Sequence, residues 1–244
     1  MSLLHVKPVY NGAMAIVHDI ERYQPFNEQE AVDRALMLRR LAADPHTFDR
    51  TSLAHCTASA WVVDPSCTRT LLVHHNIYRS WSWIGGHADG ERDLAQVAQR
   101  ELAEETGVHR VALVPCGPGG IPRLDAMQRA AERDVNGTVS GSESIPTESA
   151  GTSPIFSLEA LTVDGHEKRG AYVGSHLHLN VTYLFVASPN DPIRPKLDEN
   201  SAVRWVPLED AVSLLTEPWI RDRIYRKLIA KIERALADQS KPAQ

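Results

Sequence analysis

The order of apolar and polar residues predicts a helical start to the chain. Residues 1–53 are expected to be mostly helical, because the apolar positions that follow Asn27 recur with a rough helical period. Asn27 is the expected N-cap of this helix, with Glu30 as its capping-box partner. The Asp44-Pro45 pair is expected to end it.

From residue 54 onward the pattern changes to short segments rich in β-branched and aromatic residues, which predict strands. Strands are expected over 55–64, 68–76, 80–86, 111–115, 156–166, 176–188 and 203–208. Helices are expected over 94–106, 209–215 and 220–236. Because strands and helices are interleaved along the chain, the sequence favours an α/β layered fold.

One long segment interrupts this order. Residues 117–153 are rich in Gly, Ser, Thr and Pro and have little to bury, which predicts a flexible excursion. A short helix is expected within it, from Leu124 to Arg133. A surface insertion without function is the commoner meaning of such a segment, and a binding lid is the alternative. The expected division is an N-terminal helical extension (1–53), a main domain that contains this insertion (54–238) and a tail (239–244).

Composition excludes some classes of protein. The 244 residues carry a net charge of -5, with 43% apolar and 23% charged residues, so a nucleic-acid polymer is not an expected partner. No signal peptide and no apolar stretch long enough to cross a bilayer is apparent, so we expect a cytoplasmic protein that does not contact a membrane. Cys56, Cys67 and Cys116 are scattered, which indicates neither a disulfide framework nor a zinc knuckle. A homodimer is left open.

The helix over 94–106 is the segment that carries chemistry. Asp93 is its expected N-cap, with Gln96 placed for a capping box and Gly107 as the C′ residue. Its apolar stripe is formed by Leu94, Val97, Ala98 and Leu102. At about 100° per residue, Glu101 and Glu105 point within about 20° of Leu94, inside this stripe, and Glu104 lies at its edge.

Three carboxylates on a partly inward face repel one another and lose hydration, so something must compensate their charge. Arg100 alone cannot neutralise Glu101, Glu104 and Glu105. A divalent cation can, since hard oxygen ligands suit Mg²⁺ or Mn²⁺. The alternative is an exposed acidic helix end with solvated glutamates, although Glu at a helix C-terminus opposes the macrodipole. The glycine-rich loop from Gly85 to Gly90 lets the backbone approach a metal or a phosphate.

Together these residues resemble a known family motif. The segment GGHADGERDLAQVAQRELAEETGV resembles the box of the Nudix (MutT-like) hydrolases, G-x5-E-x7-R-E-U-x-E-E-x-G-U with U apolar. The matched residues are Gly86, Arg100, Glu101, Leu102, Glu104, Glu105, Gly107 and Val108. One position departs from the box, because Arg92 stands where its early glutamate is expected. Asp89, Glu91 or Asp93 are the acidic residues that could substitute.

The resemblance implies a fold and an activity. The fold would be a Nudix-type α/β/α sandwich with a mixed β-sheet, here with an N-terminal helical extension. The activity would be metal-assisted attack of water on a diphosphate linkage in a nucleoside diphosphate derivative. Mg²⁺ (or Mn²⁺) would be held by Glu101, Glu104, Glu105 and the carbonyl of Gly86, with Arg100 orienting the glutamates. The general base would be Glu101 or a loop glutamate such as Glu199.

Several residues outside the box are candidates for substrate binding. Trp81 and Trp83 could stack on a base, although packing is the commoner role of such residues. Lys168 and Arg169 could contact phosphates. His176 and His178 share a strand face with Asn180 and could reach phosphates, or simply form a polar strand face.

Two other functions fit the same fold. A non-catalytic ligand-sensing module is one alternative, but such modules often lose box glutamates that this chain keeps. Isopentenyl-diphosphate isomerase is another, but it relies on a cysteine in a distinctive context, which neither Cys56 nor Cys67 has. The sequence does not identify the diphosphate substrate.

Overall fold

The computed structural model describes residues 12–128, 152–168 and 170–240. The helical elements are α1 (Gly12–Arg22), α2 (Glu28–Ala43), α3 (Leu94–Thr106), η1 (Pro118–Gly120), η2 (Ala211–Leu214), η3 (Ile220–Tyr225) and α5 (Arg226–Gln239). The strands are β1 (Ala54–Val63), β2 (Arg69–His75), β3 (Ser80–Ser82), β4 (Ile84–His87), β5 (Val111–Leu113), β6 (Ile155–Val163), β7 (His166–Lys168), β8 (Ala171–Val173), β9 (His176–Ala187) and β10 (Asn200–Pro207). None of the described helices is both long and apolar enough to cross a membrane.

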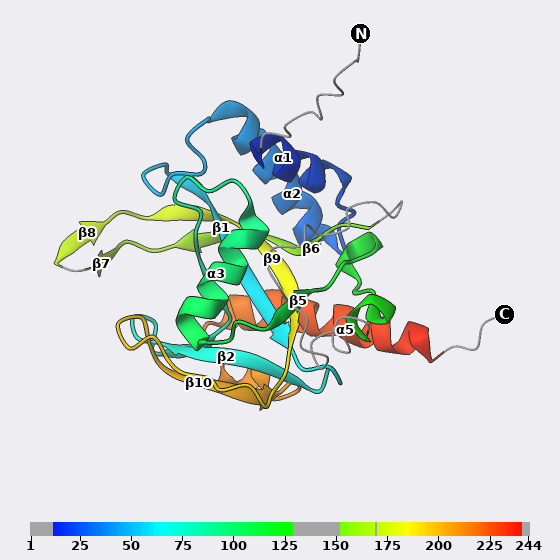
Figure 1. Cartoon of the computed structure of the whole chain (residues 1–244). Helices are drawn as coiled ribbons and strands as arrows, with labels where there is room; N and C mark the ends of the chain where they lie inside the picture. Colours follow the sequence, from blue (N-terminus) through cyan, green and yellow to red (C-terminus); the bar gives the residue numbers. More distant parts are fainter. Residues whose placement is uncertain (1–11, 129–151, 169, 241–244) are drawn as a thin grey trace, which may run out of the picture.

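The main sheet is mixed, as expected. Its central pair, β1 and β9, is parallel over ten residue pairs, and the remaining pairings are antiparallel. The order is β10-β2-β1-β9-β5, with β3 beside β2, β4 beside β1 and β6 beside β9. Strands β7 and β8 form a separate hairpin, which projects from the body of the molecule in Figure 1.

The two faces of the sheet bury different cores, which makes the molecule an α/β/α sandwich. Since side chains alternate along a strand, Cys56 and Ala58 of β1 face one core while Trp61 and Val63 face the other. The first core is shared with α1, α2 and α3, and the second with η3 and α5. Figure 1 shows α3 (green) crossing one face of the sheet. The α/β/α expectation is confirmed.

The N-terminal helices are part of the first core. Ile20 of α1 and Met37 of α2 are fully buried in it. Glu30, also fully buried, accepts a hydrogen bond from Lys231 Nζ of α5 at 2.5 Å, and Lys227 Nζ lies 3.1 Å from it. The carboxylate of Glu159 on β6 pairs with Lys227 at 3.0 Å. Helix α2 and strand β6 are therefore joined to helix α5 by buried ion pairs.

The polar half of the second face is occupied by a hydrogen-bonded row. Asn180 of β9 accepts from the hydroxyls of Thr57 (3.0 Å) and Ser59 (2.9 Å) on β1. Its amide donates to Glu159 at 2.9 Å. His55 of β1 and His178 of β9 extend the row, because they occupy the next positions on the same face. The sequence alternation of the 176–188 strand thus places polar side chains inside the molecule, not on a solvated face.

Most predicted elements are present, with differences at their ends. The predicted strand over 80–86 is two strands, and β8 is an element that the sequence pattern did not indicate. The predicted helix over 209–215 is a single 3-10 turn, and the last helix begins with a π-helical turn over Ile220–Tyr225. Residues 124–128 are helical, while the rest of the helix expected up to Arg133 lies outside the described residues, with most of the insertion.

Candidate active site

Helix α3 begins and ends where its capping residues predict. The Asp93 side chain accepts from the backbone N–H of Gln96 at 3.1 Å, and Gly107 closes the helix in the left-handed region (φ 74°). The capping-box expectation for Gln96 is wrong, because the N–H of Asp93 donates to Glu91 Oε1 at 2.9 Å. The corresponding expectation for Glu30 in α2 is also wrong, since its carboxylate accepts from the N–H of Phe26.

Glu105 is the most enclosed glutamate of the box. Its side chain is buried, and its Oε1 accepts from the N–H of Gly85 at 3.1 Å. Asn200 at the start of β10 donates to its backbone oxygen at 3.2 Å and faces its Oε2 at 3.4 Å. Burial raises the pKa of Glu105 to about 8, and the nearby carboxylates of Glu101 and Glu199 add to the rise. The surroundings of Glu105 therefore disfavour its charged form.

Glu101 lies against the backbone of β4. A Cβ atom on Gly86 would stand 2.5 Å from its Cδ, so the carboxylate and the glycine are in direct contact. Arg100 donates to Glu101 Oε1 at 2.9 Å. Burial still raises the pKa of Glu101, with Glu104 and Glu199 contributing repulsion, so this pairing does not offset the desolvation.

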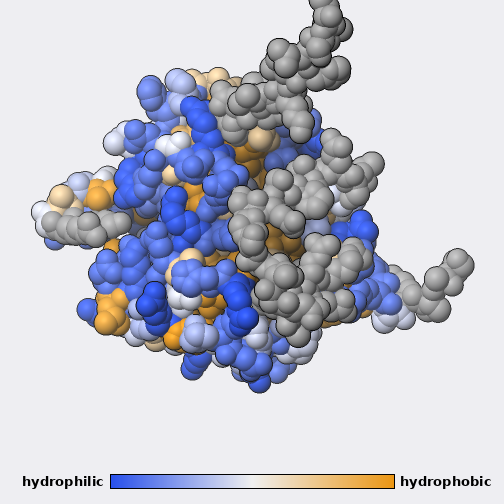
Figure 2. Space-filling model, viewed as in Figure 1, coloured by the Kyte–Doolittle hydropathy of each residue, from blue (hydrophilic) through white to orange (hydrophobic). Residues whose placement is uncertain are grey.

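Glu104 and Glu199 form the exposed side of the cluster. Lys196 Nζ lies 3.2 Å from Glu104 Oε2 and 3.1 Å from Glu199 Oε1, and thus bridges the helix to the loop before β10. The Arg100 guanidinium lies 4.0 Å from Glu104 and also reaches the carbonyl oxygen of His87 at 3.5 Å. The surface over α3 is mostly hydrophilic in Figure 2, in keeping with these exposed charges.

The loop that departs from the box is held without its early glutamate. Glu91 accepts from the N–H groups of Arg92 and Asp93, which lowers its pKa. Arg92 lies over the Phe48 ring, 5.1 Å from its centroid. Asp89, at φ 50°, forms a bidentate pair with the Arg50 guanidinium. Among the three acidic residues considered as substitutes, Glu91 is therefore the one that binds the loop backbone.

These residues fit a hard divalent cation. The donor set consists of carboxylate oxygens and backbone carbonyls, the ligands that Mg²⁺ and Mn²⁺ prefer. Two of the glutamates have pKa values raised by burial, so a bound cation would stabilise their charged form. The glycine at position 86 leaves room for a carboxylate against the strand, which a Cβ atom would fill.

Of the residues expected to bind substrate, Trp81 and Trp83 are packed in the fold, and the side chains of Lys168 and Arg169 are not described. Trp83 packs near Tyr225 (ring centroids 5.4 Å apart), and Arg204 lies over Trp81 at 4.5 Å, so both rings are packed against the second core. Lys168 ends β7 and Arg169 lies outside the described residues, so the structure says nothing of either side chain.

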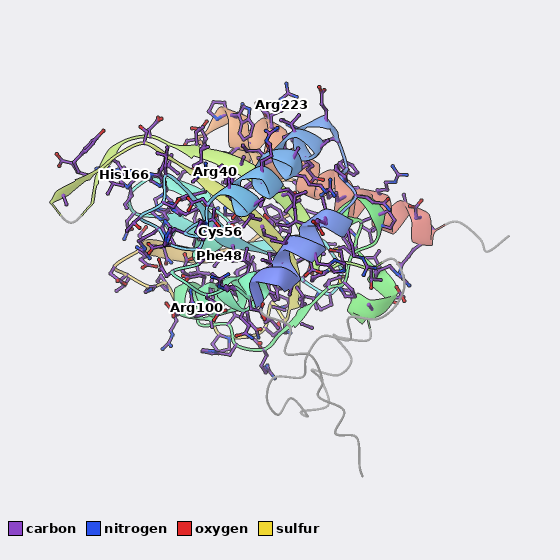
Figure 3. The ribbon with its side chains drawn as sticks, turned by 90° about the horizontal axis from the view of Figure 1, so that it is seen from above. Arg40, Phe48, Cys56, Arg100, His166 and Arg223 are labelled. Atoms are coloured by element: carbon purple, nitrogen blue, oxygen red, sulfur yellow. The ribbon has the colours of Figure 1, made fainter. Side chains whose placement is uncertain are left out.

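His176 and His178 belong to a histidine cluster that the sequence did not indicate. His55, next to them in the parallel register, lies with its ring centroid 5.1 Å from His176 and 5.0 Å from His178. His87 lies 5.0 Å from His178, and His166 lies 6.3 Å from His176. Figure 3 labels His166 on the projecting hairpin and Arg100 on α3, which carries the glutamates.

Sequence reasoning missed Lys196 and Asn200 as parts of the site. Both lie within the polar segment Lys196–Asn200, from which only Glu199 was singled out. A lysine and an asparagine in a charged loop carry no spacing signal of their own. Their part in the site depends on the tertiary structure, in which Lys196 and Asn200 contact Glu104 and Glu105 of α3.

One hollow in the described surface lies away from the box. It is lined by Phe26, Gly119, Leu124 and Arg234, none of which belongs to the box. The box glutamates do not line this hollow, and the outer side of their site carries the partly exposed charges of Glu104, Lys196 and Glu199.

Comparison with known proteins agrees with the box. Residues 54–134 match the family model of the NUDIX domain. No curated protein matches the chain. One similar solved structure is an Ap4A hydrolase of C. elegans in a binary complex, with 17% identity, a TM-score of 0.43 and a match that covers 75% of this chain and 98% of that chain. Another is a NUDIX-family hydrolase of Clostridium perfringens, with 18% identity, a TM-score of 0.42 and a match that covers 71% of this chain and 95% of that chain.

A third similar structure is the NUDIX domain of Shewanella oneidensis NrtR complexed with ADP ribose. It has 17% identity and a TM-score of 0.43, and the match covers 81% of this chain and 97% of that chain. At these identities and TM-scores, nothing about activity or substrate follows from the three structures. The family rests instead on the matched segment and the box within it. Residues 54–134 match the NUDIX domain, and within them eight of the nine defined box positions are retained.

Proposed function

We propose that the chain is a divalent-metal-dependent pyrophosphohydrolase that cleaves a diphosphate linkage in a nucleoside diphosphate derivative. The observation that carries the proposal is the pair of half-buried Glu101 and buried Glu105 against the backbone of β4, with pKa values raised by burial. Burial disfavours the negative charge of both carboxylates even though Arg100 pairs with Glu101, and a bound cation would compensate that charge.

The chain's own residues fix the donor atoms of this site. Gly85 and Asn200 hold Glu105, and Arg100 holds Glu101. Mg²⁺ or Mn²⁺ bound by Glu101, Glu104, Glu105 and the Gly86 carbonyl would neutralise diphosphate charge and acidify an attacking water. Preorganised carboxylates lower the cost of reorganisation during the reaction.

For the general base, the contacts favour Glu199 over Glu101. Glu101 is fixed between Arg100 and the Gly86 backbone, which suits a ligand with one orientation. Glu199 is 40% exposed and reaches the cluster through Lys196, so it can turn toward a water molecule at the open side. A base must accept a proton and release it to solvent, which an exposed carboxylate does more readily.

The burial of the cysteines argues against the isomerase alternative. Cys56, Cys67 and Cys116 are all buried, and burial raises the pKa of each thiol to about 12. A thiol in that state is not a nucleophile or an acid at neutral pH.

The test is a substrate screen with Mg²⁺ over nucleotide sugars, dinucleotides, ADP-ribose and nucleoside triphosphates, with Glu105→Gln beside the wild type. We expect turnover of at least one class and a loss of at least about 100-fold in Glu105→Gln, since losing even an outer-shell partner of a metal costs about 10–100-fold. If wild type and variant are equally inactive on every substrate while one ligand binds tightly, the chain is a sensing module.

A further inference from the structure

The histidine cluster lies on the other side of β4 from the glutamates. Gly86 of β4 faces Glu101 of α3, whereas the next residue, His87, has its ring 5.2 Å from that of His55 on the opposite face of the sheet. One ring nitrogen from each of His55, His176 and His178 lies within 4.8 Å of the other two. This group is the one set of at least three metal-ligating side chains gathered so closely among the residues that the structure describes.

Two of the rings have their tautomers fixed by backbone carbonyls. His55 Nδ1 lies 2.8 Å from the oxygen of Ser52, and His176 Nδ1 lies 2.8 Å from the oxygen of Gly174. A carbonyl only accepts, so the proton of each neutral ring is on Nδ1 and the lone pair is on Nε2. Metal-ligating histidines are held in the same way, by a carbonyl or carboxylate on the nitrogen that does not bind the metal.

Among the residues that the structure describes, none forms a hydrogen bond with the His55 lone pair on Nε2. His55 is 2% exposed, and its Nε2 is buried without a hydrogen bond. His178 Nε2 lies 3.2 Å from His176 Nε2, so a proton between them would satisfy that pair. That proton does not form a hydrogen bond with His55 Nε2. Buried polar atoms without partners are rare in proteins, and binding of an ion is one of the roles that explain them.

The ring charges also favour a ligand role. Burial lowers the pKa of His55, and it lowers the pKa of His178 to about 2, with repulsion among the clustered rings contributing. Burial thus disfavours the protonated form of His55 and His178, and a neutral ring is the form that binds a metal.

We propose that His55, His176 and His178 bind a first-row transition-metal ion, with Zn²⁺ the principal candidate, at a site separate from the box glutamates. Imidazole nitrogens suit Zn²⁺ and its neighbours, whereas Mg²⁺ prefers oxygen. Three protein ligands are the number that catalytic zinc sites use, with a fourth position left for water or an anionic oxygen. The ion would join β1 to β9 beside the base of the β7–β8 hairpin.

The test measures metal content and affinity without reference to turnover. The untagged full-length chain is stripped with a chelator and given ZnCl₂ in the presence of excess MgCl₂, and bound zinc is measured by mass spectrometry after dialysis. Co²⁺ serves as a spectroscopic probe, because its visible absorption reports nitrogen ligation. The wild type is expected to retain one zinc per chain and to show the absorption band.

His178→Ala and His176→Gln are expected to weaken zinc binding at least about tenfold, the lower end of the cost of losing even an outer-shell partner. His109→Gln, an exposed histidine after α3, is the matched control and is expected to bind as the wild type does. Glu105→Gln is also expected to retain zinc, which separates this site from the box. Circular dichroism of the metal-free proteins shows whether each variant is folded, and His176→Gln, at a half-buried position, serves if His178→Ala does not fold.

The proposal is overturned if the wild type holds no zinc in excess Mg²⁺, or if the folded histidine variants bind zinc as tightly as the control does. Zinc lost in Glu105→Gln but kept in the histidine variants would assign it to the glutamates instead. A rise in melting temperature with zinc in the wild type that is absent in His178→Ala gives an independent check.

Discussion

The Cβ atom that Gly86 lacks would stand 2.5 Å from the Cδ of Glu101 and 2.7 Å from its Oε1. Only glycine allows the β4 backbone and this carboxylate to lie side by side. We predict that Gly86→Ala moves Glu101 and lowers kcat/KM with Mg²⁺ by about 100-fold, as a displacement of about 1 Å can do in an active site. Gly174→Ala, where a Cβ meets nothing within 4 Å, is the control. Full activity of Gly86→Ala would show that Glu101 is dispensable.

Glu105 makes the stability of the metal-free chain depend on pH. Its pKa rises from 4.5 to about 8 in the folded state because it is buried. Between these values the folded chain holds a proton that the unfolded chain has released, so the free energy of unfolding falls as pH rises through this window. The slope is at most about 1.4 kcal/mol per pH unit. Urea unfolding of the chelated protein at several pH values measures it.

The same measurement on Glu105→Gln should lose this component of the slope, because the amide does not titrate. Added Mg²⁺ should also flatten the slope in the wild type, since a bound cation favours the charged carboxylate. An unchanged slope in the variant would assign the pH dependence to another group.

Glu199→Gln is predicted to lower kcat by about 100-fold, the lower range for loss of a general base. The Mg²⁺ concentration for half-maximal activity should change little, because Glu199 is paired with Lys196 on the open side of the cluster. Glu209→Gln, an exposed acidic residue after β10, is the control. If kcat survives in Glu199→Gln and is lost in Glu101→Gln, then Glu101 is the base.

The buried ion pair of Glu30 and Lys231 should be costly to break. Both side chains are fully buried, and the neighbouring lysines lower the pKa of Glu30 to about 2 despite its burial. Lys231→Met leaves a buried carboxylate with fewer partners, which we expect to cost about 3–5 kcal/mol in urea unfolding. Arg234→Ala, in an exposed pair with Asp238, should stay within about 0.5 kcal/mol of the wild type. The double variant Glu30→Leu with Lys231→Met should recover part of the loss.

The sequence predicts the local parts of the structure well. Helix α3 begins at the residue after Asp93 and ends before Gly107, because capping and turn preferences depend on a few neighbouring residues. The inward direction of Glu105 follows from helical geometry alone, and the residue is buried as that geometry requires. The fold class follows from the interleaving of strands and helices.

What the sequence does not predict depends on tertiary contact between distant segments. Glu30 has the spacing of a capping-box residue, but its carboxylate is taken by Lys231, two hundred residues away in the chain. His55 has no motif, and it meets His176 and His178 only because β1 and β9 pair in parallel with a particular register. Asn200 meets Glu105 because β10 lies at the edge of the sheet beside α3.

The short strand β4 has two glycines, so few side chains fix its position along β1. The pairing of Ala60 with Ile84 and of Thr57 with His87 sets which face each residue presents. A slip of one residue would turn His87 toward the glutamates and Gly86 toward the histidines, because side chains alternate between faces. Ile84, which is fully buried, is the side chain of β4 that penalises such a slip. A single isoleucine thereby keeps an imidazole away from oxygen ligands and preserves the difference in donor chemistry between the two sides of one strand.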